Sequence, residues 1–171
     1  KINKKSIISY YPEPLTRWKN NPQTITNITT VRLIKKNAGI KTHAKYIPLS
    51  KCPEKSWGVS AAMLFFDKNT YKEIPFADEI YFGYQFEEQV VLAARYWTSG
   101  YDIFTPSQHI IGTEYLTNAR RQKVKLKIDG KRQHDTFKKM CHIMKLEYNK
   151  KYENCTKSKL GNVRTIEDYY K

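Results

Sequence analysis

The stretch that decides the fold is 85–105, QFEEQVVLAARYWTSGYDIFT. Its apolar residues recur three and four positions apart from Phe86 to Trp97, which predicts an amphipathic helix that ends before Gly100. The residues from Asp102 to Thr105 have the length and composition of a short strand. Helices and strands are intermixed in this way along the chain, so we expect an α/β or α+β domain.

Upstream of this stretch the sequence predicts short strands separated by long loops. Ser6 to Tyr10 is an apolar run that stops at Tyr11-Pro12-Glu13-Pro14, as expected of a buried strand that leaves a sheet through a turn. Trp57 to Phe66 is small and apolar, which predicts a fully buried strand, although periodicity alone does not exclude a helix. Between Leu15 and Pro53 we expect a loop-rich surface region with strands only at Thr29 to Ile34 and around His43 to Ile47.

Downstream the pattern predicts two or three more strands and a last helix. His109 to Tyr115 follows Pro106 as a short strand, and Lys123 to Ile128 alternates apolar and cationic residues. Asp135 is placed to cap a helix whose apolar stripe is Phe137, Met140, Cys141, Met144 and Tyr148.

Composition limits the classes of function. The 171 residues suffice for one domain, and 40% hydrophobic residues exclude a charged disordered tail. A formal net charge of +15 predicts attraction to polyanions.

No apolar run approaches the roughly 20 residues that span a bilayer, so we expect no membrane segment. The cysteines Cys52, Cys141 and Cys155 form no CxxC pair, which argues against a zinc site or a disulfide framework and favours the cytoplasm.

Acidic residues cluster at the start of the central helix. Asp78, Glu79, Glu87 and Glu88 lie close together in a strongly basic chain. One interpretation is structural, because carboxylates at a helix N-terminus are stabilised by the macrodipole. The other is catalytic: one carboxylate binds an acceptor hydroxyl, acts as a base, or stabilises positive charge on a reacting sugar.

The basic centre of the chain is Thr117 to Lys139, which carries nine Lys or Arg residues against Asp129 and Asp135. It predicts either a nucleic-acid surface or, more simply, a solvated strand face, and no RNA-stacking motif accompanies it. A third interpretation is contact with a nucleotide diphosphate. The four histidines lack metal-ligand spacing, and the chain has no Asp-x-Asp, GxGxxG or Walker motif.

Several ordered motifs carry a family resemblance. Residues 88–106, EQVVLAARYWTSGYDIFTP, resemble the Glu-containing helix and Gly-Tyr-Asp run of the polypeptide (hydroxyproline or threonine) N-acetylglucosaminyltransferase family. Further similar segments occur in the family's order, so the resemblance runs almost from end to end. They are Ser9-Tyr10-Tyr11-Pro12, Trp57 to Phe66, Glu73-Ile74-Pro75-Phe76 and the closing run from Leu160 to Tyr170.

The resemblance implies a GT-A fold, which is a Rossmann-like α/β arrangement with a mixed sheet and flanking helices. It also implies transfer of N-acetylglucosamine, or a related sugar, from a UDP-sugar to a Hyp, Thr or Ser hydroxyl of a polypeptide, with retention of configuration. The family binds its donor through Mn²⁺ or Mg²⁺ at an Asp-x-Asp motif that precedes the Ser-Thr-Tyr-Pro segment. Residues 1–171 therefore resemble the C-terminal, acceptor-side half of one catalytic domain, without the nucleotide-binding half.

The resemblance also implies site residues. Glu88, with Glu87, is expected beside the acceptor hydroxyl and the sugar ring. Counted back from Arg95, the family's Gly-Glu-Glu aligns with Glu87-Glu88-Gln89, so that Gln89 replaces the second Glu. Counted forward from Pro75, the pair is Glu87 and Glu88, and in both alignments Glu88 is a carboxylate. Trp57 and Trp97 are candidates for the sugar pocket, with core packing as the other role of Trp97. Arg95 and Asp102 are also candidates for substrate binding. The other role of Arg95 is to anchor the helix by pairing with Asp102 or a backbone carbonyl.

The largest departure of this sequence from the family pattern is at the expected metal site. The family has a His, expected to bind the metal, seven residues after the Pro that corresponds to Pro106, and this chain has Thr113 there. A hydroxyl is a poor substitute for imidazole, which leaves Glu114 or His109 as ligands after a shift in register. The alternatives to an active transferase are a degenerate transferase-like binding module and a basic nucleic-acid-binding domain. The family allows the Golgi lumen as well as the cytoplasm.

Overall fold

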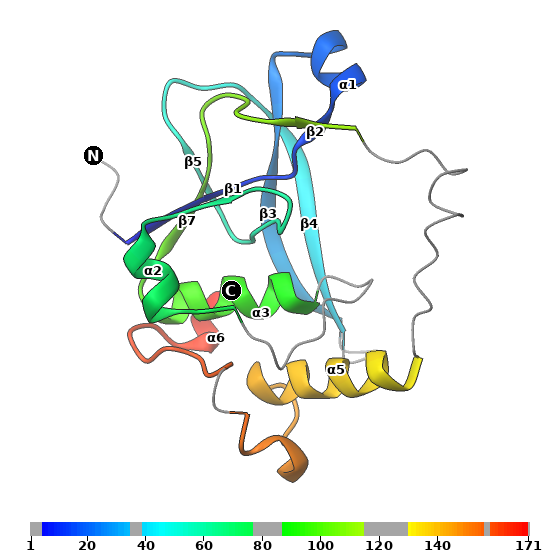
Figure 1. Cartoon of the computed structure of the whole chain (residues 1–171), viewed down its shortest axis with the longest axis vertical. Helices are drawn as coiled ribbons and strands as arrows, with labels where there is room; N and C mark the ends of the chain where they lie inside the picture. The colour runs from blue at the N-terminus through cyan, green and yellow to red at the C-terminus, as the bar shows by residue number, and fades with distance from the viewer. Residues whose placement is uncertain (1–4, 35–38, 77–86, 115–129, 156–157, 171) are drawn as a thin grey trace.

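A mixed four-stranded sheet forms the centre of the structure, a computed structural model that describes residues 5–34, 39–76, 87–114, 130–155 and 158–170 (Figure 1). The strands lie in the order β5-β7-β1-β6. β1 and β7 are parallel, and each pairs with an antiparallel outer strand. Their bounds are β1 (Ser6–Ser9), β5 (Glu54–Ser56), β6 (Leu64–Phe65) and β7 (Asp102–Thr105). The strands expected at Ser6 to Tyr10 and Asp102 to Thr105 are confirmed.

Helices pack around this sheet and close the core. α3 (Glu87–Thr98) contacts β7, α5 (Gly130–Ile143) and α6 (Ile166–Tyr169), and α2 (Lys68–Glu73) follows β6. The 3₁₀ turn η2 (Lys150–Tyr152) lies between α5 and α6 in the chain. The main core is formed by residues from all these layers, including Ile7, Val91, Ala94, Ile103, Met140, Met144 and Ile166. A mixed sheet with flanking helices confirms the predicted α/β class.

α3 ends where the sequence predicts. Gly100 has a positive φ of 87°, and the Tyr101 N–H donates to the Tyr96 carbonyl at 2.9 Å. The Gly100 N–H donates to the Trp97 carbonyl, also at 2.9 Å, which completes a Schellman motif. Glycine adopts this left-handed conformation without steric cost, so the chain can turn directly from α3 into β7.

The prediction for Leu15 to Pro53 is confirmed in part: the strands expected at Thr29 to Ile34 and around His43 to Ile47 are present. The region is not loop-rich, because both strands are much longer than expected. β3 (Thr24–Ile34) and β4 (Gly39–Pro48) pair along almost their whole length as an antiparallel hairpin. Thr and Ile dominate the start of β3, and Ile25 and Ile28 are buried. An added Cβ on Gly58 would lie 2.7 Å from Ile28 Cγ2, so this glycine permits the hairpin to pack closely. Pairing with β4, rather than local sequence, stabilises this segment.

A short helix and a small parallel sheet occupy the region after the first strand. β2 (Glu13–Pro14) pairs with β8 (Gly112–Thr113), and α1 (Leu15–Asn20) begins directly after Pro14. The sequence analysis missed α1. The strand expected from His109 to Tyr115 is reduced to two residues in the described part of the chain, and the strand expected at Lys123 to Ile128 lies outside it.

The expected buried strand from Trp57 to Phe66 is largely wrong. Only β6 is strand, and its Phe65 is 66% exposed. The Ser60 N–H donates to Ser9 Oγ at 2.8 Å, and the Ser9 hydroxyl donates to the Met63 carbonyl at 2.7 Å. The buried Ser9 side chain thus forms hydrogen bonds with backbone groups of this segment. In a regular strand, a neighbouring strand would provide these bonds.

α5 begins five residues earlier than expected. Asp135 is not the cap of the helix, because it lies inside it. Its side chain instead binds Lys151 and Tyr152 from the following segment. Met140, Cys141 and Met144 are buried as predicted. Tyr148 is wrong as a core residue, because it lies beyond the helix and is 70% exposed.

We expect Tyr10→Phe to lower the free energy of unfolding by about 2 kcal/mol. The fully buried Tyr10 hydroxyl accepts the N–H groups of Ile110 and Ile111 at 3.0 and 2.8 Å and donates to the Ile111 carbonyl at 2.7 Å. Its removal leaves these backbone groups without that partner. Urea denaturation measures the loss, and Tyr46→Phe on the exposed face of β4 is the control, with an expected change below about 0.5 kcal/mol. Equal stability of Tyr10→Phe and the natural protein would contradict the anchoring role.

Candidate active site

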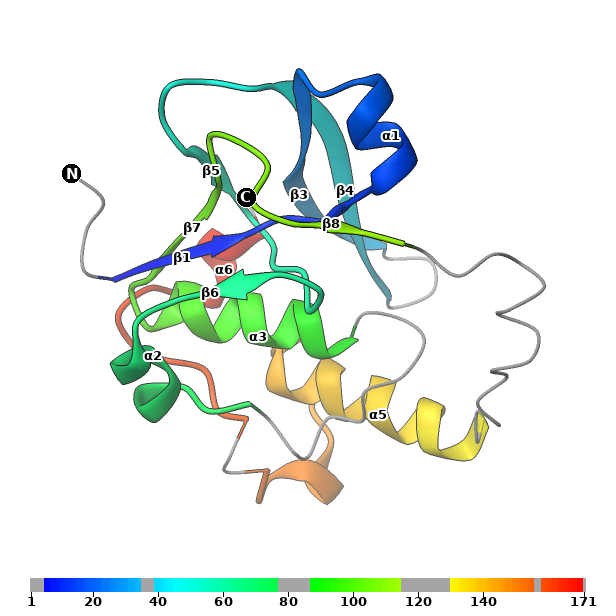
Figure 2. The ribbon, with the colours of Figure 1, turned by 45° about the horizontal axis from the view of Figure 1, so that its top comes forward.

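β6 lies beside α3 (Figure 2). A cavity of about 380 Å³ is lined by side chains of α3 and of the segment around β6. Glu88, Gln89, Leu92 and Arg95 line it from one face of α3, and Phe76 closes one side. Its remaining walls are small or apolar side chains from the segment between β5 and α2, namely Val59, Ala61, Ala62, Leu64 and Phe66. The cavity therefore presents a few polar groups in an apolar surround, as ligand sites generally do.

Glu88 is the carboxylate of this cavity. It is the second residue of α3 and is half-buried, with its Oε2 atom fully buried. The helix N-terminus stabilises a negative charge there. A carboxylate in a partly apolar cavity can orient a hydroxyl or stabilise a developing positive charge. The side chain of Glu87 lies outside the described part of the structure.

Gln89 connects this cavity to the first strand. The Tyr11 hydroxyl donates to Gln89 Oε1 at 3.2 Å. Tyr11 follows β1 in the Ser-Tyr-Tyr-Pro segment, which is far from α3 in sequence. The sequence analysis did not predict that this tyrosine lies at the site. The resemblance of its segment to a family motif was the available signal.

Arg95 has a bridging position at the bottom of the cavity. It is 4% exposed, its Nη1 donates to the Pro75 carbonyl at 2.6 Å, and its Nε donates to the Lys159 carbonyl at 3.3 Å. These bonds join α3 to the segment after α2 and to the closing run. Of the two anchoring partners proposed from the sequence, the structure therefore shows backbone carbonyls and not Asp102.

Trp57, Trp97 and Asp102 form a second cluster, apart from Glu88. The two indole rings lie 5.0 Å apart, and the guanidinium of Arg164 lies 4.4 Å from the Trp97 ring centroid. Arg164 Nη1 also donates to Asp102 Oδ1 at 3.0 Å. None of these residues lines the Glu88 cavity. The structure thus places Trp97 with the core, and Asp102 with Arg164, which the sequence analysis did not single out.

The closing run docks on the end of α3. The Gly161 N–H donates to Thr98 Oγ1 at 2.8 Å, and the Val163 N–H donates to the Thr98 carbonyl, also at 2.8 Å. Arg164 continues this contact through the Tyr101 and Gly100 carbonyls. The side-chain bonds account for the arginine. The glycine is required by close packing, because an added Cβ on Gly161 would lie 2.5 Å from the Ser99 nitrogen.

Another motif contact joins Glu73 to the Gly-Tyr-Asp run. The Tyr101 hydroxyl donates to Glu73 Oε2 at 2.6 Å, and Lys5 Nζ lies 3.0 Å from Glu73 Oε1. The hydrogen bond from Tyr101, with a smaller contribution from Lys5, lowers the pKa of Glu73. A carboxylate whose pKa is lowered by folding stabilises the protein above its unfolded pKa and loses that contribution as pH falls through the folded value.

We expect the stability difference between the natural protein and Glu73→Gln to be largest above about pH 4.5 and to shrink at lower pH. Urea denaturation at several pH values between 3 and 7 measures it. Tyr101→Phe removes the main donor, so it should flatten the pH dependence in the same way. If the difference does not change across this range, the bond does not lower the pKa of Glu73.

The candidate metal ligands do not converge. Thr113 is in β8 beside Pro14, Glu114 is exposed, and the His109 ring packs 5.0 Å from Trp18 with both nitrogens buried. Among the described residues there is no group of three His, Cys, Asp or Glu side chains that could hold a metal ion.

The basic segment Thr117 to Lys139 is only partly described. Lys131 and Lys138 are exposed on α5, whereas residues 115–129 lie outside the described part. No structural contact of this segment tests the nucleic-acid interpretation.

Within the described helices, none combines the length and apolar character needed to cross a membrane.

The fold and the cavity define a mixed α/β domain with a carboxylate at the N-terminus of its central helix. Comparison with protein families shows that the model of the family Glycosyltransferase (GlcNAc) matches residues 1–171. The chain belongs to this family of GlcNAc glycosyltransferases. A search of curated proteins found no significant match.

Proposed function

We propose that this chain provides the acceptor side of a GT-A site that transfers N-acetylglucosamine, or a related sugar, from a UDP-sugar to a Hyp, Thr or Ser hydroxyl of a polypeptide. Membership of the GlcNAc glycosyltransferase family supports sugar transfer. The observation that carries the assignment of the site is Glu88, a half-buried carboxylate in a cavity of about 380 Å³.

In this proposal the transfer retains the anomeric configuration. The bond between the anomeric carbon and the diphosphate oxygen breaks, and the acceptor oxygen bonds to the same face of the sugar. The hydroxyl proton passes to the departing diphosphate. Glu88 accepts a hydrogen bond from the acceptor hydroxyl and stabilises the positive charge that develops on the sugar ring.

The remaining residues of the site position the reactants. Arg95 holds α3 at a fixed distance from Pro75, which orients Glu88. The apolar wall at Ala61, Ala62 and Leu92 excludes water from the reacting carbon. The donor diphosphate and a divalent cation, Mn²⁺ or Mg²⁺, would be held mainly by residues other than those described, and the cation would supply charge neutralisation of the leaving group.

The test is UDP release by the full-length natural protein from UDP-GlcNAc and other UDP-sugars, with Mn²⁺, Mg²⁺ or EDTA. Peptides that contain Hyp, Thr or Ser are the acceptors, and mass spectrometry identifies the product. Cation-dependent transfer to a hydroxyl supports the proposal. Binding of a UDP-sugar or peptide without any turnover overturns it in favour of a degenerate binding module, and Thr113 in place of the family's His would then account for the lost activity.

A further inference from the structure

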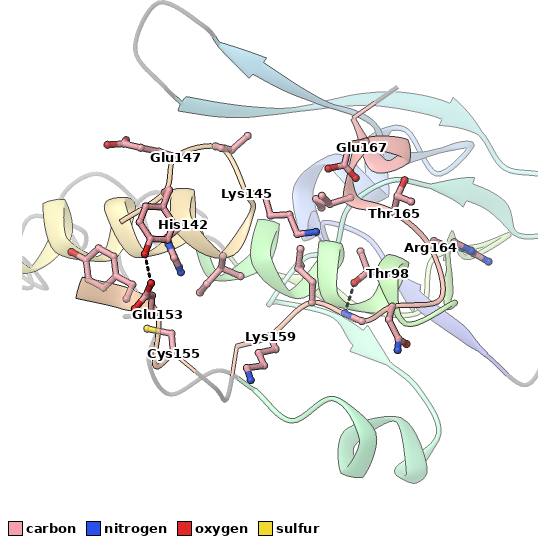
Figure 3. A pocket seen from close by; sticks show the side chains of 18 of the residues that line it. Thr98, His142, Lys145, Glu147, Glu153, Cys155, Lys159, Arg164, Thr165 and Glu167 are labelled. Carbon is pink, nitrogen blue, oxygen red and sulfur yellow. Dashed lines mark hydrogen bonds between the residues drawn. The ribbon is translucent and has the colours of Figure 1, made fainter. Parts of the chain in front are cut away.

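A second cavity, of about 730 Å³, shares no lining residue with the Glu88 cavity. One wall is formed by the end of α5 and the segment up to Cys155, and the other by the closing run and the start of α6 (Figure 3). This volume is within the range of pockets that bind small molecules. No step of the proposed transfer uses these residues.

The first wall exists because the chain reverses at Lys145. This residue has a φ of 55°, and the Leu146 N–H donates to the Cys141 carbonyl at 2.9 Å, as in the glycine-terminated end of α3. A lysine in the left-handed region costs about 1 kcal/mol relative to glycine. The reversal ends α5 and begins the segment from Leu146 to Cys155, which lines this side of the cavity.

The second wall is held in place by the bonds that dock the closing run. Gly161 and Val163 are fixed on Thr98. Arg164 points away from the cavity towards Asp102 (Figure 3). The guanidinium of Arg164 therefore fixes this wall from behind, while its charge is directed to Asp102 and not into the cavity.

The charge of the cavity differs from that of the whole chain. The chain has 31 Lys and Arg residues against 16 Asp and Glu. The charged side chains of the cavity lining are Lys145, Lys159, Arg164, Glu147, Glu153 and Glu167. Arg164 is paired with Asp102, which does not line the cavity, so two Lys and three Glu remain. A lining without excess positive charge in a strongly basic protein does not favour an anionic ligand.

Aromatic and hydrogen-bonding groups lie together on the first wall. The Tyr148 ring is 70% exposed and packs 5.8 Å from His142, and the Tyr148 hydroxyl donates to Glu153. His142 Nδ1 accepts the Asn149 N–H at 3.1 Å, so the neutral imidazole carries its proton on Nε2 as a donor. Asn162 adds an exposed amide from the opposite wall.

We propose that this cavity is a second, non-catalytic site that binds a neutral oligosaccharide. The apolar C–H face of a sugar packs on an exposed aromatic ring such as Tyr148. Its hydroxyls both donate and accept hydrogen bonds, which matches a lining of carboxylates, an amide and an imidazole N–H. The mixed charges of the lining, without excess positive charge, suit a ligand that carries no net charge.

The experiment is saturation-transfer NMR on the full-length protein with chitotriose and cellotriose, in the presence of excess UDP-GlcNAc. Binding of at least one trisaccharide is expected. We expect Tyr148→Ala to weaken it about tenfold or more, and Asn162→Ala to weaken it measurably, because both side chains are exposed and their removal leaves the core intact. Tyr46→Ala, which removes another exposed tyrosine outside the cavity, is the matched control and should leave the affinity unchanged.

Three outcomes would overturn the inference. One is no binding of either trisaccharide at millimolar concentration, and another is binding that Tyr148→Ala and Asn162→Ala leave unchanged. The third is displacement of the sugars from this cavity by an uncharged peptide of similar size that binds more tightly, which would make it a polypeptide site. UDP release by Tyr148→Ala should equal that of the natural protein, so failure of this site is distinguishable from failure of the transferase proposal.

Discussion

Replacing Glu88 with Gln is expected to lower the turnover number for sugar transfer by about 10² to 10⁴, with little change in stability. The amide keeps the shape of the side chain in the cavity but removes the charge that would orient the acceptor hydroxyl and stabilise the sugar cation. Steady-state UDP release and product formation by the full-length protein measure the effect.

The matched control for this prediction is Glu54→Gln. Glu54 is an exposed carboxylate in β5 and does not line the cavity, so its turnover number should equal that of the natural protein. Full activity of Glu88→Gln would exclude this carboxylate from catalysis and leave the helix macrodipole as the reason for its position. Thermal unfolding of both variants separates a loss of chemistry from a loss of fold.

Gly161→Ala is expected to lower the free energy of unfolding by about 3 kcal/mol or more. An added Cβ would lie 2.5 Å from the Ser99 nitrogen and 2.6 Å from the Thr98 carbonyl carbon. Because backbone atoms cannot rotate away, the closing run must leave the end of α3. The hydrogen bonds of Gly161 and Val163 to Thr98 would be lost with it.

Urea denaturation measures this loss, and Gly112→Ala is the control. A Cβ on Gly112 would also meet atoms within 3 Å, but they belong to the side chains of Leu15 and Trp18 at the edge of α1. We expect a smaller loss there, since side chains can shift. If both variants lost the same free energy of unfolding, the clash between the closing run and the α3 backbone would not be the cause of the loss in Gly161→Ala.

The family-like motifs contact one another, although many residues separate them in the sequence. The Tyr11 hydroxyl reaches Gln89, and the Tyr169 hydroxyl donates to the Trp57 carbonyl at 2.7 Å. Arg95 donates to the carbonyl of Pro75. The order of the motifs could be recognised in the sequence, whereas these pairings depend on how the chain folds.

The sequence alone could have divided the predicted site residues into two groups. Trp97 follows Glu88 by nine positions, which is about two and a half turns of an α-helix and places the two residues on opposite sides. The structure agrees, because Glu88 lines the cavity while Trp97 packs against Trp57. Helical spacing could therefore have shown that one sugar site would not include both.

The sequence by itself determined the elements whose signals are local. The apolar repeat of α3, its end at Gly100 and the strand β7 follow from spacing and backbone preference within a few residues. The family resemblance and the candidate carboxylate Glu88 were also visible in the sequence. Only the tertiary structure decided that β3 and β4 pair and that Ser9 satisfies the segment after Trp57. These features depend on partners distant in the chain, and local propensity carries no information about such partners.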